Sequence, residues 1–311
     1  MLQHVLRVEQ FDRPLLDQIL RHADAMREVA ERGGDDRLAG RILATIFYEP
    51  STRTRLSFES AMMRLGGGVI SSEMATETSS AAKGETIEDT VRIVESYAHA
   101  IVFRHPEPGT VDRAAAVASV PVINAGDGAR EHPSQALLDL YTIQRELGRI
   151  DNLNIALIGD LKYGRAPRSL AMLLTRTEGC HIQLVSPPQL EMASDVTEKL
   201  EQAGISFEVS HDLDGAVASA DVVYITRIQK ERFPSEAAYA EVRGAYRLTA
   251  ALARTMRAGA VILHPLPRVD EIAPEVDSLP QAAYFRQARN GVYVRMALLD
   301  MLLNSRGNPA S

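Results

Sequence analysis

Short apolar runs, turns and amphipathic segments alternate along almost the whole chain. Residues 42–47 form an apolar run rich in β-branched and aromatic side chains, which predicts a buried strand, and the segment after it has the spacing of an amphipathic helix. Similar strand-like runs follow at 69–71, 100–103 and 120–124. Helical spacing is found over 15–32, 84–97 and from 133 onward. The first half therefore predicts repeated strand–turn–helix units.

The same pattern restarts after the polar, glycine-containing stretch 148–152, which we take as a domain boundary. The second half has strand-like runs at 154–158, 182–185, 206–209, 222–226 and 261–263. Such alternation predicts right-handed crossovers onto mainly parallel sheets. The expected fold class is α/β, with two doubly wound domains, 1–148 and 149–289, each a mainly parallel sheet flanked by helices. The last helix, predicted over 290–304, could cover either domain, and we expect the segment of about 290–311 to join the first.

Composition describes a globular chain with few options for metal or redox chemistry. The 311 residues are 45% hydrophobic and 24% charged, with a net charge of −7, which argues against a nucleic-acid partner. The single cysteine, Cys180, excludes an intrachain disulfide and fits a reducing compartment. We see no signal peptide and no apolar run long enough to span a membrane, so we expect a cytoplasmic protein without a membrane partner.

Candidate chemistry is concentrated in residues 49–59, between the first strand and its helix. Hydroxyls of Ser51, Thr52 and Thr54 and the guanidinium of Arg53 surround the start of that helix, where N–H groups and the helix dipole favour an anion. We interpret this turn as a cradle for a phosphate or similar oxyanion. Ser51 or Thr52 is expected to cap the helix, and Arg55 is expected to pair with Glu59 one turn later.

Other polar side chains also follow predicted strands. Arg104, His132, Arg165 and Arg227 each come just after one, and the carboxyl ends of parallel strands share one rim of a sheet. His132 and Gln135 lie three residues apart, on one face of a first helical turn. Each residue alone also fits a plainer role: a solvated arginine, a helix-capping histidine or, for Lys83 at the end of a polar loop, a solvated lysine.

Several common site types are not predicted. The turn after residue 158 lacks G-x-G-x-x-G, and no Walker pattern occurs, so neither a dinucleotide nor a nucleoside triphosphate has a motif. His132 has no further ligand at a metal-binding spacing, and Cys180 is not in an evident nucleophile turn. We therefore expect no cofactor and no metal.

The turn 264–267, His-Pro-Leu-Pro, either presents carbonyl groups to a ligand or is a rigid connection.

Six motifs in one order resemble the catalytic chains of aspartate carbamoyltransferases, in the aspartate/ornithine carbamoyltransferase superfamily. They cover essentially the whole chain and are Ser-Thr-Arg-Thr-Arg at 51–55, Phe-Arg-His-Pro at 103–106, His-Pro-Ser-Gln at 132–135, Asp-Leu-Lys-Tyr-Gly-Arg at 160–165, Thr-Arg-Ile-Gln at 226–229 and His-Pro-Leu-Pro-Arg at 264–268.

The resemblance implies a carbamoyl-phosphate domain followed by an aspartate domain, with the active site between them. It assigns carbamoyl phosphate to Ser51, Thr52, Arg53, Thr54, Arg104, His132, Gln135 and the backbone of Leu266 and Pro267. It assigns aspartate to Lys83, Arg165, Arg227 and Gln229. The residues implied in catalysis are Arg53, Thr54, Lys83, Arg104 and His132. It also implies a homotrimer in which the loop with Ser79 and Lys83 reaches the neighbouring subunit's site.

The implied activity is transfer of the carbamoyl group of carbamoyl phosphate to the amino group of L-aspartate, in de novo pyrimidine biosynthesis. An ornithine-type transcarbamylase is the nearest alternative. In those enzymes the turn that corresponds to 264–267 reads His-Cys-Leu-Pro, whereas this chain has Pro265 in place of the cysteine. Arg165, Arg227 and Lys83 also suit the extra carboxylate of aspartate. A noncatalytic anion-binding subunit is a second alternative, although every expected catalytic position is filled. A regulatory chain or a pathway enzyme remains a possible partner.

Overall fold

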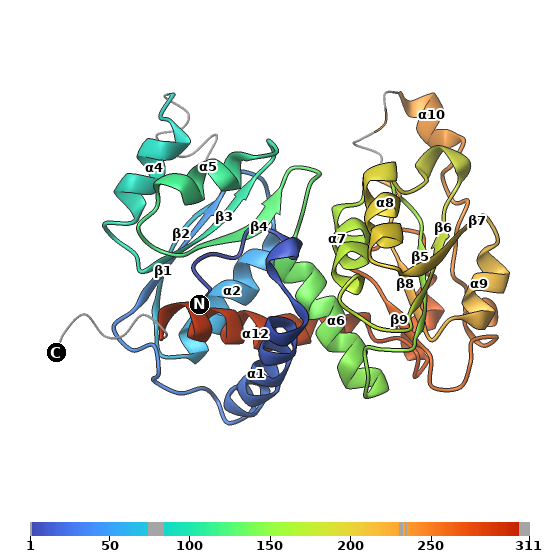
Figure 1. Cartoon of the computed structure of the whole chain (residues 1–311), viewed down its shortest axis with the longest axis horizontal. Coiled ribbons are helices and arrows are strands. Elements are labelled where there is room, and N and C mark those ends of the chain that lie inside the picture. Colours follow the sequence, from blue (N-terminus) through green and yellow to red (C-terminus); the bar gives the residue numbers. More distant parts are fainter. Residues whose placement is uncertain (1, 74–83, 230–232, 234, 305–311) are drawn as a thin grey trace. The chain divides into compact units, whose positions relative to one another are not determined.

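The computed structural model describes residues 2–73, 84–229, 233 and 235–304 of the chain. The chain divides into two compact units, which Figure 1 shows. Unit 1 consists of Met1–Leu137 and Arg289–Ser311, and unit 2 of Leu138–Ala288. Each unit contains a parallel sheet flanked by helices, so the predicted α/β class is confirmed.

The sheet of unit 1 has four parallel strands in the order β2-β1-β3-β4. They are β1 (Ile42–Phe47), β2 (Gly68–Glu73), β3 (Ala100–His105) and β4 (Val122–Asp127). The chain moves outward from β1 to β2 and then returns to β3 on the other side of β1. The order therefore reverses between β1 and β3, and the carboxyl ends of strands at such a switch point are where ligands bind in open α/β sheets.

Helices cover both faces of this sheet (Figure 1). On one face lie α4 (Ile87–Val94) and α5 (Thr110–Val117), whose Val91 and Val111 pack in a core cluster with Ala44 and Ile46 of β1. The other helices of unit 1 are η1 (Val8–Gln10), α1 (Arg13–Glu31), α2 (Thr52–Arg64), the start of α6 (Pro133–Leu147) and most of α12 (Tyr284–Leu303). Because alternate β1 side chains point to opposite faces, the strand reads as a continuous apolar run.

The sheet of unit 2 has five parallel strands in the order β7-β6-β5-β8-β9. They are β5 (Asn154–Ile158), β6 (His181–Val185), β7 (Ser206–Ser210), β8 (Val222–Ile225) and β9 (Val261–Leu263). Its other elements are α7 (Arg165–Leu174), η3 (Pro188–Leu190), α8 (Ser194–Gln202), α9 (Leu213–Ser219), α10 (Glu236–Ala240), α11 (Ala250–Ala253) and η5 (Pro274–Ser278). Here the order reverses between β5 and β8, which places a second switch point at their carboxyl ends.

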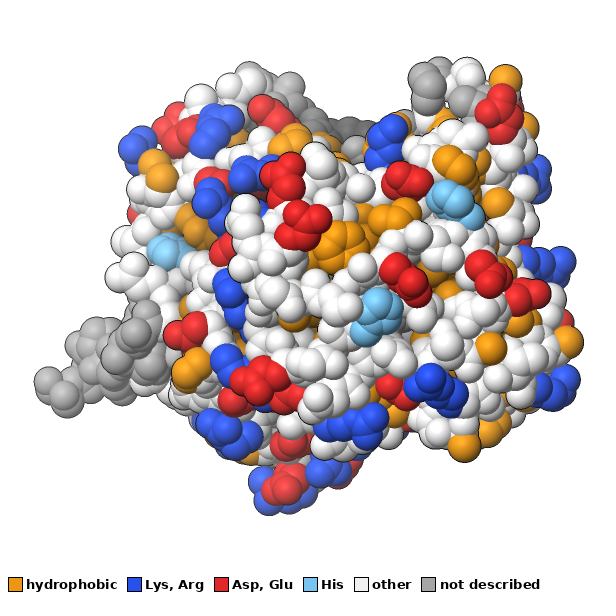
Figure 2. Space-filling view, turned by 45° about the vertical axis from the view of Figure 1, so that its right-hand side comes forward, with side chains coloured by type: hydrophobic (Ala, Val, Ile, Leu, Met, Phe, Trp, Pro, Cys, Tyr) orange, Lys and Arg blue, Asp and Glu red, His pale blue; other side chains and the backbone are white. Residues whose placement is uncertain are grey.

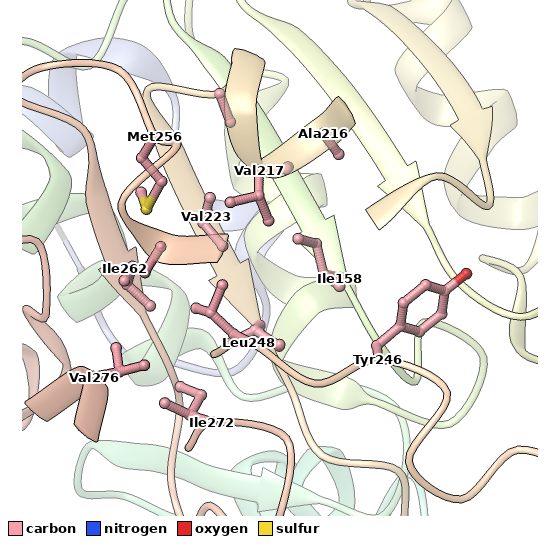
Figure 3. Close-up of a cluster of buried hydrophobic side chains, with 14 of the residues drawn as sticks. Ile158, Ala216, Val217, Val223, Tyr246, Leu248, Met256, Ile262, Ile272 and Val276 are labelled. Atoms are coloured by element: carbon pink, nitrogen blue, oxygen red, sulfur yellow. The ribbon is translucent and has the colours of Figure 1, made fainter. Parts of the chain in front are cut away.

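One face of this second sheet carries a core cluster that reaches well beyond the strands (Figure 3). Ile158, Val223 and Ile262 of adjacent strands pack with Leu248 and Met256 from the long connection after β8, with Ile272 from the segment after β9 and with Val276 of η5. Leu248 and Ile272 also form a parallel β-bridge. The irregular segments that follow β8 and β9 are thus fixed by burial.

Element ends differ from the sequence prediction where tertiary contacts decide them. Helix α12 begins at Tyr284 rather than at 290, because Tyr284 and Gln287 are buried. Strand β4 extends through Gly126, whose φ of +131° a glycine tolerates, to Asp127.

No helix among the described residues is long and apolar enough to cross a membrane. On the face of the molecule that Figure 2 shows, acidic and basic side chains are interspersed.

Candidate active site

The turn between β1 and α2 carries the predicted anion cradle. Thr52 opens α2, and Ser51 stands at the N-cap position, but the Ser51 side chain makes no capping hydrogen bond. Ser51 is thus the N-cap residue, as predicted, but the predicted cap by its side chain is wrong, because the Ser51 backbone, with ψ of 78°, departs from the extended conformation typical of a capping residue. The Ser51 hydroxyl is not committed to the helix, and Arg53 is exposed at its first turn.

Arg55 has a structural role, as predicted. Its guanidinium contacts Glu59 at 3.3 Å and Glu73 at 2.8 Å. The Glu59 carboxylate also accepts hydrogen bonds from Thr45 at 2.9 Å and Ser71 at 2.8 Å. The expected Arg55–Glu59 pair is thus confirmed, and the pair joins α2 to β1 and β2.

Thr54 and His132 come together although they follow different strands. The Thr54 Oγ1 and the His132 Nε2 are 3.5 Å apart, and both residues are buried. The other ring nitrogen, Nδ1, lies 3.5 Å from the hydroxyl of the buried Ser134. A hydroxyl and an imidazole edge therefore face the same place, beside the first turn of α2.

Arg104 lies within β3 rather than after it, in register with Phe47 of β1. Its Nη1 donates to the Ala125 carbonyl at 3.1 Å, and its Nη2 pairs with Glu49 at 2.7 Å. The side chain is 12% exposed. Glu49, which the sequence reading did not single out as a site residue, thus orients the guanidinium at the ends of β1 and β3.

The start of α6 adds Gln135. Pro133 occupies the first helical position, as predicted, and the His132 carbonyl accepts from the Gln135 N–H at 2.9 Å. The residues Ser51, Thr52, Arg53, Thr54, Arg104, His132 and Gln135 all belong to unit 1 and stand at or just beyond the carboxyl ends of β1, β3 and β4. Hydroxyl, guanidinium and imidazole groups at a switch point can bind an oxyanion and stabilise negative charge on a carbonyl oxygen.

In unit 2 the loops after β5 and β8 carry three of the residues predicted to bind the substrate aspartate. Arg165 opens α7 after β5, and Arg227 and Gln229 follow β8. The buried carboxylate of Asp160 accepts from the Tyr163 N–H at 2.9 Å and from the Gln229 N–H at 3.2 Å. Asp160 thus ties the two loops together, a role that the sequence did not reveal.

Gly159 allows the same two loops to meet. Its φ is +114°, and a Cβ at this position would stand 2.2 Å from the Thr226 carbonyl oxygen. Only glycine fits this close approach.

The turn after β9 presents Leu266 and Pro267. Leu266 has a positive φ of 54°, and the Leu266–Pro267 peptide is cis. The Leu266 N–H donates to His264 Nδ1 at 2.7 Å, and His264 Nε2 contacts Glu271 at 2.6 Å. Side-chain hydrogen bonds therefore hold this turn in place in addition to its prolines.

Two predicted residues, Ser79 and Lys83, lie outside the described residues. Within the described part of the chain, no three His, Cys, Asp or Glu side chains gather in a way that could hold a metal ion.

Known proteins match both halves of the chain. Residues 3–145 match the family model of the aspartate/ornithine carbamoyltransferase carbamoyl-P binding domain, and residues 151–302 match that of the Asp/Orn binding domain. The aspartate carbamoyltransferase catalytic subunit of Methanopyrus kandleri is 56% identical over 300 residues, which cover 96% of each chain. A chloroplastic aspartate carbamoyltransferase of Pisum sativum is 52% identical over 97% of this chain and 79% of its own.

Solved structures agree with these matches. The catalytic subunit of M. jannaschii aspartate transcarbamoylase has a TM-score of 0.92 at 46% identity, covering 99% of this chain and 100% of that one. Aspartate transcarbamoylase from Trypanosoma cruzi, in complex with carbamoyl phosphate and aspartate, has a TM-score of 0.92 at 42% identity, covering 97% of each chain. The chain therefore belongs to the aspartate/ornithine carbamoyltransferase family.

Proposed function

We propose that the chain transfers the carbamoyl group of carbamoyl phosphate to the amino group of L-aspartate, giving N-carbamoyl-L-aspartate and phosphate. The reaction belongs to de novo pyrimidine biosynthesis. The observation that carries the proposal is the approach of Thr54 to His132, 3.5 Å apart, in unit 1, where Arg104 stands at the switch point between β1 and β3. The proposal is also supported by two relatives that are named aspartate carbamoyltransferase and match nearly the whole chain at 56% and 52% identity.

The reaction needs hydrogen-bond donors at the carbonyl oxygen of the carbamoyl group and positive charge beside the phosphate and the aspartate carboxylates. The aspartate nitrogen forms a bond to the carbonyl carbon, an oxyanion develops, and the bond from that carbon to the phosphate oxygen breaks. The leaving phosphate takes the amine proton. Thr54, Arg104 and His132 are the groups that would donate to the oxyanion, where removing one donor typically costs about 3 kcal/mol of barrier. Holding two anionic substrates in position supplies further acceleration.

We assign roles to the remaining residues by the same chemistry. Ser51, Thr52, Arg53 and Thr54 hold the phosphate, because hydroxyls and a guanidinium at a helix start suit an oxyanion. Gln135 and the backbone of Leu266 and Pro267 contribute to the carbamoyl group, together with Arg104 and His132. Lys83, Arg165, Arg227 and Gln229 bind aspartate. Residues 1–148, with about 290–311, form the carbamoyl-phosphate domain, and 149–289 form the aspartate domain.

The choice between amino acids is tested directly. Purified chain is supplied with carbamoyl phosphate and either L-aspartate or L-ornithine, and the carbamoylated product is measured. We expect product with aspartate only. Turnover of ornithine alone would contradict the assigned substrate, and turnover of neither would favour an anion-binding subunit without catalysis.

We further propose a cytoplasmic homotrimer with shared sites, in which Ser79 and Lys83 serve the neighbouring subunit. Mixing Lys83→Ala chains with Arg53→Ala chains, each inactive alone, should then restore part of the activity, because some sites receive both intact residues. No recovery in properly mixed trimers would contradict sharing. Native mass, measured with and without cell extract, tests for a regulatory chain or a pathway partner.

A further inference from the structure

The backbone at Leu266 has an uncommon conformation that side chains hold in place. Leu266 and Asn152 are the non-glycine residues with positive φ in the described part of the chain. A leucine in this region carries a conformational cost that its surroundings must offset. The Leu266 N–H donates to His264 Nδ1 at 2.7 Å. The imidazole of His264, 1% exposed, therefore determines how Leu266 is oriented.

Glu271 contacts the other ring nitrogen of His264 and so holds the imidazole in place from the opposite side. Its Oε1 lies 2.6 Å from His264 Nε2, and its Oε2 accepts from the backbone N–H groups of Val269 at 3.0 Å and Asp270 at 3.1 Å. Because Nδ1 accepts from Leu266, the Nε2 nitrogen carries the proton and donates to Glu271. Burial alone would raise the pKa of Glu271, but His264 and the backbone donors outweigh it and lower the pKa.

Both ends of this network are anchored in the interior of unit 2. The Glu271 carbonyl accepts from the Leu248 N–H at 2.8 Å, beside the Leu248–Ile272 bridge in the core (Figure 3). The backbone N–H of His264 donates to Gln287 Oε1 at 2.8 Å, and Gln287 Nε2 donates to the carboxylate of the buried Asp139 at 2.6 Å. The carboxylate and the imidazole are thus fixed before any substrate arrives.

We propose that Glu271 is a positioning residue for the carbamoyl site, acting through His264 on the Leu266 carbonyl. The carbamoyl group ends in an NH2 group, which needs a hydrogen-bond acceptor, and a fixed backbone carbonyl supplies one. This inference rests on the proposed function, which assigns the Leu266 backbone to the carbamoyl group. Glu271 itself touches no substrate, and its effect is geometric.

Glu271→Gln is the first test. Glutamine keeps the shape but turns one oxygen into an NH2 group, which opposes either the His264 donor or the backbone N–H groups. We expect kcat/KM for carbamoyl phosphate to fall by about 10- to 100-fold, as for a displaced positioning group, with a smaller change in KM for aspartate. Glu275→Gln, at an exposed position four residues later, is the matched control and should behave as wild type.

Two His264 variants separate positioning from stability and remain informative if Glu271→Gln folds poorly. Asn at 264 can still accept from the Leu266 N–H two residues on, whereas Gln at 264 approximates only the Nε2 donor. We expect His264→Asn to retain more of kcat/KM for carbamoyl phosphate than His264→Gln.

Equal kinetic losses in the two His264 variants, or a Glu271→Gln chain that melts earlier but has unchanged kinetic constants well below its melting temperature, would overturn the inference. Absence of carbamoyl transfer to aspartate in the wild type and in Glu275→Gln would instead contradict the proposed function, and this inference with it.

Discussion

The hydroxyl of Thr54 and the Nε2 of His132 lie 3.5 Å apart, although the two residues are separated by 78 positions in the sequence. Parallel pairing of β1, β3 and β4 brings the two segments together, since the segments after these strands meet at one edge of the sheet. Both side chains are buried beside the first turn of α2. Burial lowers the local dielectric, so donors here act more strongly on a developing charge than they would in water.

Thr54→Val tests this pair, because valine keeps the shape and removes the hydroxyl. We expect kcat to fall by about 10²- to 10³-fold, the usual effect of losing one oxyanion donor. Steady-state kinetics with both substrates varied provides the measurement. Thr90→Val, on α4 of the same unit, serves as control and should retain wild-type kcat; a similar kcat for Thr54→Val would refute the donor role.

Arg53→Ala and Arg104→Ala should each abolish most turnover while leaving a folded chain. Arg104 loses a charge-assisted contact with substrate, whereas its partner Glu49, 23% exposed, can be solvated by water at little cost in stability. Turnover and far-UV circular dichroism are compared with Arg92→Ala, whose side chain is 61% exposed on α4. Near-normal rates in either variant would show that its assigned role is wrong.

Arg227→Ala should act on aspartate more than on carbamoyl phosphate. Removing one cation from a carboxylate site costs about 1.5–3 kcal/mol, which corresponds to a rise in KM for aspartate of about 10- to 150-fold. Arg254→Ala, at an exposed position of unit 2, is the control. An unchanged KM for aspartate with a raised KM for carbamoyl phosphate would contradict the role of Arg227 in aspartate binding and place it at the carbamoyl-phosphate site.

Gly159→Ala should destabilise unit 2. The added Cβ would stand 2.2 Å from the Thr226 carbonyl, so the loops after β5 and β8 must separate. We expect a loss of at least about 2 kcal/mol in the free energy of unfolding, measured by urea denaturation. Gly204 also has a positive φ, of +70°, but a Cβ there would meet nothing within 4 Å, so Gly204→Ala should lose only about 1 kcal/mol. Equal losses would mean that the close approach contributes nothing.

Asp300 should make the stability of unit 1 depend on pH. Burial raises its pKa, but the hydrogen bond from His22 and the charge of Arg37 outweigh burial, and the net pKa is lowered. A lowered folded pKa means that Asp300 stabilises the fold above its unfolded pKa of about 3.9, and that this contribution is lost as pH falls toward the folded value.

Asp300→Asn should therefore cost about 2–3 kcal/mol at pH 7, somewhat less than for a fully buried pair, because His22 and Arg37 are partly exposed. The difference from wild type should shrink as pH falls below about 4, because the wild-type carboxyl takes up a proton first in the unfolded chain and, at lower pH, in the folded chain as well. Melting temperatures at fixed protein concentration, with Asp89→Asn as exposed control, provide the check. A difference that persists unchanged at pH 3 would rule out the charge as its cause.

Much of the strand pattern was predictable, because fully buried parallel strands leave an unmistakable apolar run. The ranges of β1, β5 and β9 agree with the prediction, and the resemblance of six motifs pointed to the family that the comparisons confirm. Local propensity is sufficient where the whole element is buried by its neighbours.

Contacts between distant residues were not predictable in the same way. Glu49 beside Arg104, and Glu271 beside His264, are single charged residues that no spacing rule singles out. The start of α12 at Tyr284 was missed because burial of Tyr284 and Gln287 depends on unit 2 as folded. A sequence pattern reports one element at a time, whereas these features arise when elements pack.

The most direct measurement is a crystal structure of the chain grown with carbamoyl phosphate. The phosphate oxygens should lie within hydrogen-bonding distance of Ser51, Thr52, Arg53 and Thr54, and the carbonyl oxygen within about 3 Å of donors from Thr54, Arg104 and His132. A ligand bound away from the β1–α2 turn, or one whose carbonyl oxygen contacts none of these three donors, would contradict the assigned site.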